Sequence, residues 1–317
     1  MPTTNPESRG YAPLLAQMLA CSCLWAGAFL LMKLVASDLS PLALTAVRGI
    51  MGSLLLGAWL LVRGQGIVPR GREWGDWIVL GLLQGVVPNA LTAFALTQIT
   101  AGLTAMIQAS APLMVAVLAH ALFTDERLTP RRGGGVLVGF SGIVILLGPA
   151  ALSDASASRL GVLAMAAAAV SYAFGNLYVR TIPAPQPLRL AFGQQAFSGV
   201  PAVAAVLLHI GPSGFAGASD HFLTLALLGV FGTALPIVLY MNILRLAGPT
   251  LGSMNGYLVP IWTIALGVAL LGEVPTPHEI LAGGLIIAGV AIVSSARRAR
   301  PPEPENALTA AKKPHPG

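Results

Sequence analysis

Ten uncharged side chains stand out because they interrupt stretches of sequence that are otherwise strongly apolar. Six are amides and four are prolines: Gln84, Asn89, Gln108, Asn176, Asn242 and Asn255, with Pro88, Pro112, Pro236 and Pro260. An amide both donates and accepts hydrogen bonds, and a proline within a helix frees the carbonyl four residues before it. In apolar surroundings these groups must face protein or a water-filled cavity. Such residues could bind a small polar solute. Prolines that only shape helix packing would leave the same pattern.

Aromatic side chains recur beside these polar positions, and they are Trp25, Tyr172, Tyr240, Tyr257 and Trp262. At helical spacing Gln108 lies one turn from Pro112, and Pro236 lies one turn from Tyr240, so polar and aromatic groups gather around the breaks. Aromatic stripes usually pack helices together. Their coincidence with the prolines favours contact with the apolar part of a solute.

Ionisable groups within the apolar stretches are few. Arg48 and Lys33 could each attract a carboxylate, or each could snorkel to the interface or cap carbonyls at a neighbouring helix end, and the second interpretation is favoured. His120 could carry a proton, but a lone histidine is more often a hydrogen-bonded packing residue. Because no Asp or Glu lies in the middle of an apolar stretch, the sequence predicts no carboxylate proton relay. Proton coupling through other groups and uncoupled facilitated movement both remain open.

The elements that must position these residues are membrane-spanning helices. Of 317 residues, 55% are hydrophobic and 9% are charged, whereas a soluble domain has roughly 25% charged residues. Spanning the hydrocarbon takes ~20 apolar residues in a helix. Ten stretches qualify: 14–36, 41–62, 75–97, 101–123, 132–150, 158–180, 188–209, 221–245, 249–271 and 277–296. The sequence therefore predicts an all-α polytopic protein of ten helices in a lipid bilayer, with residues 1–12 and 298–317 as disordered tails.

Basic residues orient the chain. Fifteen of the 18 Lys and Arg residues lie in or beside the N-terminal tail, the even-numbered loops and the C-terminal tail. The positive-inside tendency therefore places both termini in the cytoplasm. The net charge of +6 follows from this topology, and no Lys/Arg cluster interleaved with aromatic residues indicates a nucleic-acid partner.

The chain is a tandem duplication. Two nearly equal shifts superpose its halves: 148 residues places Pro88 on Pro236 and Pro112 on Pro260, while 147 places Trp25 on Tyr172 and Glu126 on Glu273. We expect a first repeat at residues 13–150 and a second at 151–297. Because each repeat holds five spans, the second must enter the membrane inverted. Inverted repeats of this kind are typical of secondary transporters with a site between the halves.

The distribution of arginines agrees with this inversion. Arg63, Arg70 and Arg72 follow the second span, whereas the equivalent stretch 209–221 has no Lys or Arg. Equivalent loops thus differ in basic content, as they should when they face opposite sides of the membrane.

Several features in this order resemble the EamA family of the drug/metabolite transporter superfamily. They are Trp25-Ala26-Gly27 and Lys33, SPLALTAVRG at 40–49, Pro112, Glu126 and a glycine-rich fifth span, repeated as Tyr172, Arg180, Pro260, Glu273 and a glycine-rich tenth. The resemblance covers residues 14–296. It implies two inverted five-helix repeats around a central cavity, and export of amino acids or other small metabolites across a bacterial inner membrane. The aromatic amino-acid exporters are one branch. The chain departs from repeat symmetry in having Gln195 where the first copy has Arg48.

Other classes of function lack the residues that they need. The sequence has no P-loop, HExxH, GxSxG or Cys/His metal spacing, so we expect no cofactor, no metal site and no enzymatic activity. Two alternatives remain: an efflux carrier for drugs or other small metabolites, and a non-transporting membrane scaffold or sensor.

Small residues at Gly135 and Gly139, and at Gly284 and Ala288, predict close helix contacts within a monomer or a homodimer.

Overall fold

The protein is helical throughout the part that the structure describes. This computed structural model covers residues 8–122, 128–152, 156–183 and 186–295, with side chains except at 8–12, 146–152, 156–158, 241, 244–254, 257 and 294–295. The elements are α1 (Ser8–Val35), α2 (Pro41–Val62), α3 (Glu73–Leu80), η1 (Gly81–Val86), α4 (Val87–Gln98), α5 (Ala101–Gln108), α6 (Ala111–Leu122), α7 (Pro130–Leu152), α8 (Ser156–Val179), α9 (Pro187–His209), η2 (Pro212–Ala218), α10 (Phe222–Gly229), η3 (Val230–Ala234), α11 (Leu235–Leu271) and α12 (Pro277–Ser295). The all-α class is confirmed, and these ranges contain no strand.

Seven helical stretches are long and apolar enough to cross a membrane. They are 13–35, 41–62, 73–98, 101–122, 159–179, 187–209 and 222–240, and two shorter apolar helices follow at Leu258–Leu271 and Pro277–Val293. The expected span at 132–150 corresponds to α7, whose side chains are described only as far as Ile145. α1 begins at Ser8, so residues 8–12 are helical rather than part of a disordered tail; residues 1–7 and 296–317 lie outside the described ones.

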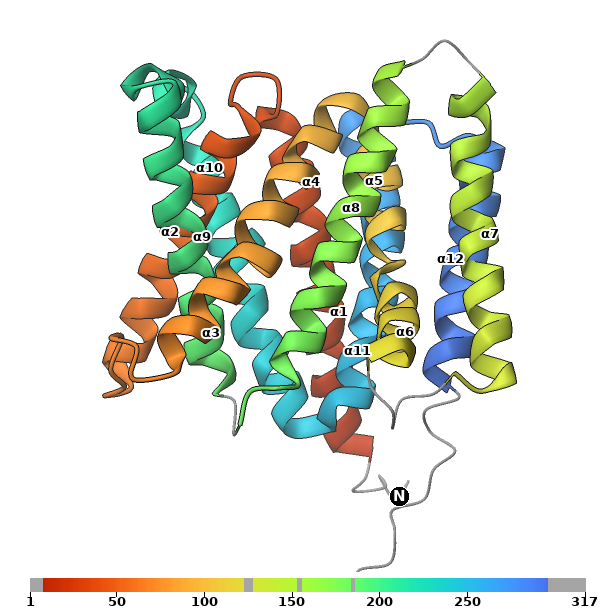
Figure 1. Cartoon of the computed structure of the whole chain (residues 1–317), viewed down its shortest axis with the longest axis horizontal. Coiled ribbons are helices and arrows are strands. Elements are labelled where there is room, and N and C mark those ends of the chain that lie inside the picture. The colour runs from red at the N-terminus through yellow and green to blue at the C-terminus, as the bar shows by residue number, and fades with distance from the viewer. Residues whose placement is uncertain (1–7, 123–127, 153–155, 184–185, 296–317) are drawn as a thin grey trace, which may run out of the picture.

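The predicted break between the spans 221–245 and 249–271 is absent. α11 is one helix of 37 residues, assigned without interruption through Leu271. A straight helix of this length would extend about 55 Å, well beyond the ~30 Å hydrocarbon core. Figure 1 shows why it nevertheless fits: its ribbon turns at the lower edge, so that the chain descends along one arm and rises along the other.

Local signals explain several helix ends. The hydroxyl oxygens of Ser40 and Thr100 accept hydrogen bonds from the amides of Ala43 and Leu103, which caps the starts of α2 and α5. Gly272 ends α11 in the left-handed conformation, with φ of 65°, which glycine adopts without steric cost.

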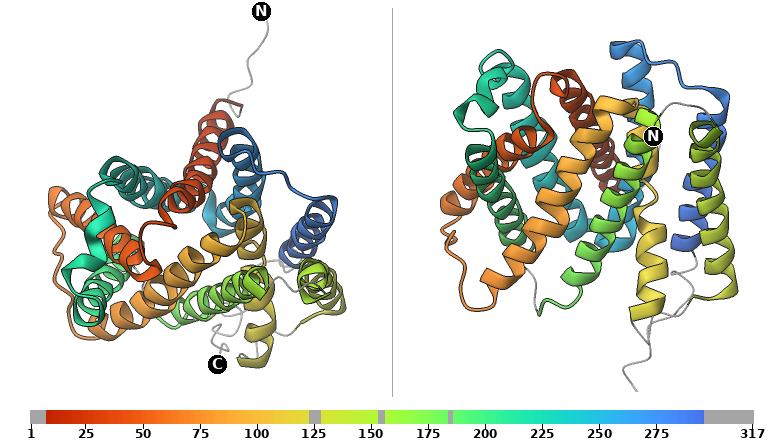
Figure 2. Two further views of the ribbon diagram at one scale, coloured as in Figure 1. Left: turned by 90° about the horizontal axis from the view of Figure 1, so that it is seen from above. Right: turned by 45° about the horizontal axis from the view of Figure 1, so that its top comes forward.

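The helices pack in pairs that join the first half of the chain to the second. The main partnerships are α1 with α11, α2 with α9, α4 with α8 and α7 with α12. Figures 1 and 2 show α7 and α12 together at one edge of the bundle, and Figure 1 shows α1 beginning and α12 ending at its same, lower edge. Neither half therefore folds as a separate bundle, and the space between the halves lies inside the protein.

Close backbone contact holds α7 against α12. A Cβ added at Gly289 would collide with the Gly139 amide nitrogen and would lie 2.5 Å from the carbonyl oxygen of Gly135. The predicted small-residue contact at Gly135 and Gly139 is thus made within the chain. Gly284 differs, because a Cβ there would meet no atom within 4 Å.

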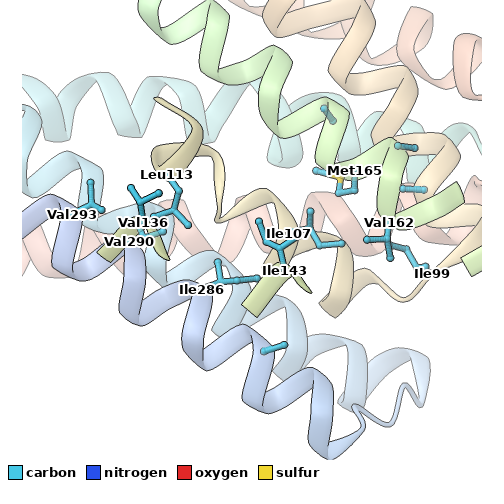
Figure 3. Close-up of a cluster of buried hydrophobic side chains, with 14 residues drawn as sticks. Ile99, Ile107, Leu113, Val136, Ile143, Val162, Met165, Ile286, Val290 and Val293 are labelled. Carbon is cyan, nitrogen blue, oxygen red and sulfur yellow. The ribbon is translucent and has the colours of Figure 1, made fainter. Parts of the chain in front are cut away.

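Apolar side chains fill the region between α5–α6, α7, α8 and α12. Figure 3 shows this cluster, in which Ile107, Leu113 and Met165 are fully buried and Ile286 and Val290 contribute from α12. Burying large apolar side chains of this kind contributes about 1.5–3 kcal/mol each when the alternative is water. This packing fixes the positions of α5, α6 and α8 relative to α7 and α12.

Candidate functional site

A cavity of about 450 Å³ lies between the two halves of the chain, within the ~300–1,000 Å³ typical of small-molecule sites. Helices α1, α2, α4, α5, α6, α8, α9 and α11 all contribute to its wall. Nine predicted contact residues line it: Trp25, Gln84, Asn89, Gln108, Pro112, Tyr172, Asn176, Tyr240 and Pro260. Arg48 lines it as well.

The remaining predicted residues lie elsewhere. Pro88 and Pro236 are buried within their helices rather than at the wall. The Asn242 amide donates to Gln17 Oε1 over 2.8 Å, and the fully buried Asn255 amide donates to Cys21 Sγ over 3.2 Å. These contacts stabilise helix packing.

Two further candidates from the ninth predicted span do not enter the site. Trp262 is half-buried away from the described cavity wall. The side chain of Tyr257 lies outside the described residues.

Lys33 and His120 also lie away from the cavity. Lys33 Nζ donates to the carbonyls of Leu96 and Ile99 over 2.5 and 2.7 Å, so it caps the end of α4, as the favoured interpretation of its sequence position predicted. His120 is exposed, and its Nδ1 accepts a hydrogen bond from the Leu128 amide over 3.2 Å.

The chain bends before two of the prolines through π-helical turns. In η1 the Val87 amide donates to the carbonyl of Leu82, and in η3 the Leu235 amide donates to the carbonyl of Val230, five residues back in both cases. Pro88 and Pro236 follow directly. The sequence predicted bends here from the prolines alone, but the structure adds a wider turn of the kind that often marks functional sites.

The carbonyls that this irregularity frees are satisfied by side chains from the second half of the chain. Pro88 has no amide hydrogen for the carbonyl of Gln84, and that carbonyl accepts instead from Gln194 Nε2 over 2.9 Å. The neighbouring carbonyl of Leu83 accepts from Ser171 Oγ over 2.8 Å. Freed backbone groups therefore bind the two halves together at the cavity wall.

Arg48 carries the positive charge of the cavity. Its Nε donates to Thr233 Oγ1 over 3.2 Å, and its Nη1 donates to Asn89 Oδ1 over 3.2 Å and lies 3.3 Å from the Met32 sulfur. Tyr172 donates to the same Asn89 oxygen over 3.3 Å. Instead of snorkelling to the interface, the guanidinium points inward, at a cost of roughly 3 kcal/mol or more for a charge within a bilayer.

The cavity wall is two-fold in its sequence positions. Seven pairs of lining residues stand 147 or 148 positions apart: Trp25 and Tyr172, Phe29 and Asn176, Arg48 and Gln195, Asn89 and Ile237, Thr92 and Tyr240, Gln108 and Gly256, and Pro112 and Pro260. Chemically the pairs are unequal, because Arg48, Asn89 and Gln108 each face a neutral, apolar or small counterpart. Repeat symmetry thus builds the shape of the wall, while the one cation among its described lining residues comes from the first copy.

The upper end of the cavity is sealed. Apolar side chains from the ends of α1, α4 and α9 and the starts of α2 and α5 pack there around Val35, Leu44 and Leu96. Glu273 accepts hydrogen bonds from the first two amides of α5 over 2.8 and 3.3 Å. At the same end Asp38 Oδ2 lies 2.6 Å from His221 Nε2, which joins the first half of the chain to the second.

Exposure rises toward the opposite end. Asn89 is 3% and Thr92 4% exposed, whereas Asn176 and Gly256 are exposed wall residues. Asn176 lies three residues before α8 ends at Val179, on the lower edge in Figure 1. The cavity therefore opens toward the edge at which α1 begins and α12 ends.

Sequence reasoning missed two wall residues of consequence, Gln194 and Gln195. Gln195 is 4% exposed, and its Oε1 accepts no hydrogen bond from any described group. The repeat alignment pairs Gln195 with Arg48, but its place at the cavity wall was not predicted. No comparable signal marks Gln194, because its partner is a backbone carbonyl.

The duplication is matched by a known family. A model of the EamA-like transporter family fits the chain twice, at residues 13–148 and 159–295. The chain belongs to the EamA-like transporter family. Membership agrees with the resemblance drawn from Trp25, Pro112 and Glu273 and their repeat equivalents.

Several proteins similar to this EamA-family chain are named as transporters. YedA of Escherichia coli (strain K12), an uncharacterized inner membrane transporter, is 26% identical over 297 residues, which is 93% of this chain and 95% of YedA. The chloroplastic WAT1-related protein At3g02690 of Arabidopsis thaliana is 33% identical over 161 residues, 50% of this chain and 38% of that protein. One solved crystal structure, 22% identical, shares the fold with a TM-score of 0.63 over 92% of this chain and 99% of its own.

Proposed function

We propose that this EamA-family protein is a secondary transporter that exports small amphipathic metabolites, amino acids foremost, by alternating access. The observation that carries the proposal is the cavity of about 450 Å³ between the halves, whose wall combines amides, aromatic rings and one cation. An amphipathic solute needs such a wall, because its polar and apolar ends must both be matched.

The repeat-paired wall supports alternating access. Ten spans in two inverted five-helix repeats, at residues 13–150 and 151–297, would put a pseudo-two-fold axis through the cavity. Exchange of conformation between the repeats would then move the opening from one membrane face to the other. The two matches to the family model, at 13–148 and 159–295, support this division.

Direction of transport follows from orientation. If the basic loops lie inside, the lower edge in Figure 1 faces the cytoplasm of a bacterial inner membrane. The open end of the cavity would then admit solutes from the cytoplasm, as an exporter requires. In this conformation the Lys33, Glu273 and Asp38 contacts would form the closed outer gate.

Two other functions compete with this one. An efflux carrier for drugs would use the same cavity with a broader range of solutes, and the aromatic pair of Trp25 and Tyr240, with ring centroids 5.2 Å apart, suits flat apolar molecules too. A non-transporting scaffold or sensor has no need of a polar wall. Enzymatic activity, a cofactor and a metal do not enter the proposal, and its partners are a small solute and the lipid bilayer, as monomer or homodimer.

Reconstitution tests the proposal. Proteoliposomes containing the purified protein should exchange labelled phenylalanine for unlabelled phenylalanine across the bilayer, and Gln108→Ala should slow exchange by about tenfold, as expected for loss of one ligand hydrogen bond. Gln98→Ala is the matched control, because Gln98 contacts Thr97 outside the cavity. If no amino acid is exchanged, the proposed substrate class is wrong. If the two alanine variants slow exchange equally, the cavity is not the substrate site.

A further inference from the structure

Arg48 is a cation whose described hydrogen-bond partners are all neutral. Its Nε and Nη1 contact a hydroxyl, an amide oxygen and a thioether. No carboxylate of the described residues forms an ion pair with it, and none of the described lining residues is Asp or Glu. Arg189 shows the contrast within the same chain, since its guanidinium pairs with Glu73 over 2.7 Å.

Unused donors sit next to this charge. Arg48 Nη2 donates to no group that the structure describes, although the guanidinium is a fork of five donors. Asn89 Oδ1 accepts hydrogen bonds from Arg48 and Tyr172, whereas Asn89 Nδ2 makes no hydrogen bond to a described group. Asn89 Oδ1 thus holds Arg48 and Tyr172 together, and Arg48 Nη2 and Asn89 Nδ2 remain as donors for a solute.

Position makes these donors available to a solute from one side only. Arg48 contacts Met32, which lies three residues before α1 ends at Val35 on the sealed side, and Asn89 is 3% exposed. Trp25 lies seven residues before Met32 on α1, nearer the open end, and its ring contacts Tyr240. A solute that enters from the open end would meet aromatic rings along its length and the guanidinium at its tip.

We propose that Arg48 and Asn89 form a carboxylate-binding subsite, so that the solutes of this cavity are small organic acids with an apolar body, with or without an amino group. This inference rests on the proposed carrier function and narrows its substrate class. Guanidinium and carboxylate match in charge and geometry, and their hydrogen bonds are among the stronger ones in proteins. An ammonium group finds no negative partner on the described wall, so it contributes little to binding.

Binding to the purified full-length protein tests the subsite without transport. The probes are 3-phenylpropanoate, phenylalanine and phenethylamine, which share one ring and differ in the carboxylate and the amine. Affinity is taken from the ligand-dependent rise in the thermal unfolding temperature. We expect 3-phenylpropanoate and phenylalanine to bind with similar affinity and phenethylamine to bind at least about tenfold more weakly, because it lacks the charge-assisted hydrogen bond of the carboxylate.

Variants assign the effect to the pair. Arg48→Gln, which copies the residue at position 195, should weaken both carboxylates at least about tenfold. Asn89→Asp keeps the cation but places a carboxylate against it, and should weaken the same probes even if Arg48→Gln fails to fold. Arg63→Gln is the control, because Arg63 is an exposed cation over the Trp59 ring, outside the cavity.

The outcomes separate the subsite from the carrier function. Loss of carboxylate binding in both cavity variants, with retention in the control, supports the subsite. The inference is overturned if phenethylamine binds as well as 3-phenylpropanoate, if neither carboxylate binds, or if folded Arg48→Gln keeps its affinity. Exchange in proteoliposomes is scored separately: carboxylate binding without exchange of any probe would refute the carrier and leave the subsite standing.

Discussion

Gln194→Leu should destabilise the protein because it removes the only described side-chain donor to the Gln84 carbonyl. That contact is 2.9 Å long and part-buried. Pro88 cannot replace it, since proline has no amide hydrogen to complete the helical bond. Leaving a buried acceptor without a donor costs about 1–3 kcal/mol, and the partial burial favours the lower half of that range. The expected loss in free energy of unfolding is therefore about 1–2 kcal/mol.

A double-mutant cycle with Pro88→Ala isolates this contact. The substitution supplies an amide hydrogen four residues after Gln84, which can complete a regular helical bond to the same carbonyl. In that background Gln194→Leu should cost much less, and the coupling free energy between the two positions should be about 1 kcal/mol or more.

Equilibrium unfolding in mixed detergent and SDS micelles measures these free energies. Gln195→Leu is the matched control: the residue is adjacent on α9 and also at the cavity wall, but its Oε1 has no described partner. The reasoning is refuted if Gln194→Leu costs no more than Gln195→Leu, or if its cost is the same with and without Pro88.

Three further predictions concern the sealed end and the packing. Lys33→Met should lower the free energy of unfolding by about 1–3 kcal/mol because the carbonyls of Leu96 and Ile99 at the end of α4 lose their donor, while Lys33→Arg should lose less; the same micelle titration compares them. Glu273→Gln should cost about 1 kcal/mol by weakening the cap on the first amides of α5, and hydrogen exchange at those amides should rise. Gly193→Ala would drive a methyl group into the Trp77 ring and should cost about 1–3 kcal/mol, whereas Gly284→Ala, with open space around it, should leave the unfolding midpoint unchanged or higher.

Features that depend on composition and spacing were predictable. Long apolar stretches marked the helices, since lipid requires backbone groups to bond within one segment. Proline spacing located the irregular turns near Pro88 and Pro236, and repeat spacing brought residues such as Gln108 and Tyr172 to one wall. These inferences needed only periodicity along the chain.

Features that depend on partners across the bundle were not predictable. Asn255 and Asn242 carry the same amide as Gln108, yet they bond to Cys21 and Gln17 rather than facing the cavity. Helical spacing gives the angle of a side chain about its own axis, but not which neighbour that angle meets. The same applies to Gln194, whose role depends on a carbonyl that Pro88 frees in another helix.

Pro112 and Pro260 stand in equivalent places, but their surroundings differ. The chain is non-helical at 109–110, between α5 and α6, whereas α11 passes through Pro260 without interruption. The same motif is thus interrupted in one copy and continuous in the other. In the proposed carrier the opposite state requires no third shape, because each copy can take the form that its twin already has. Backbone hydrogen bonds lost in one copy would be regained in the other. The carrier would therefore change between its two states without an energy source of its own.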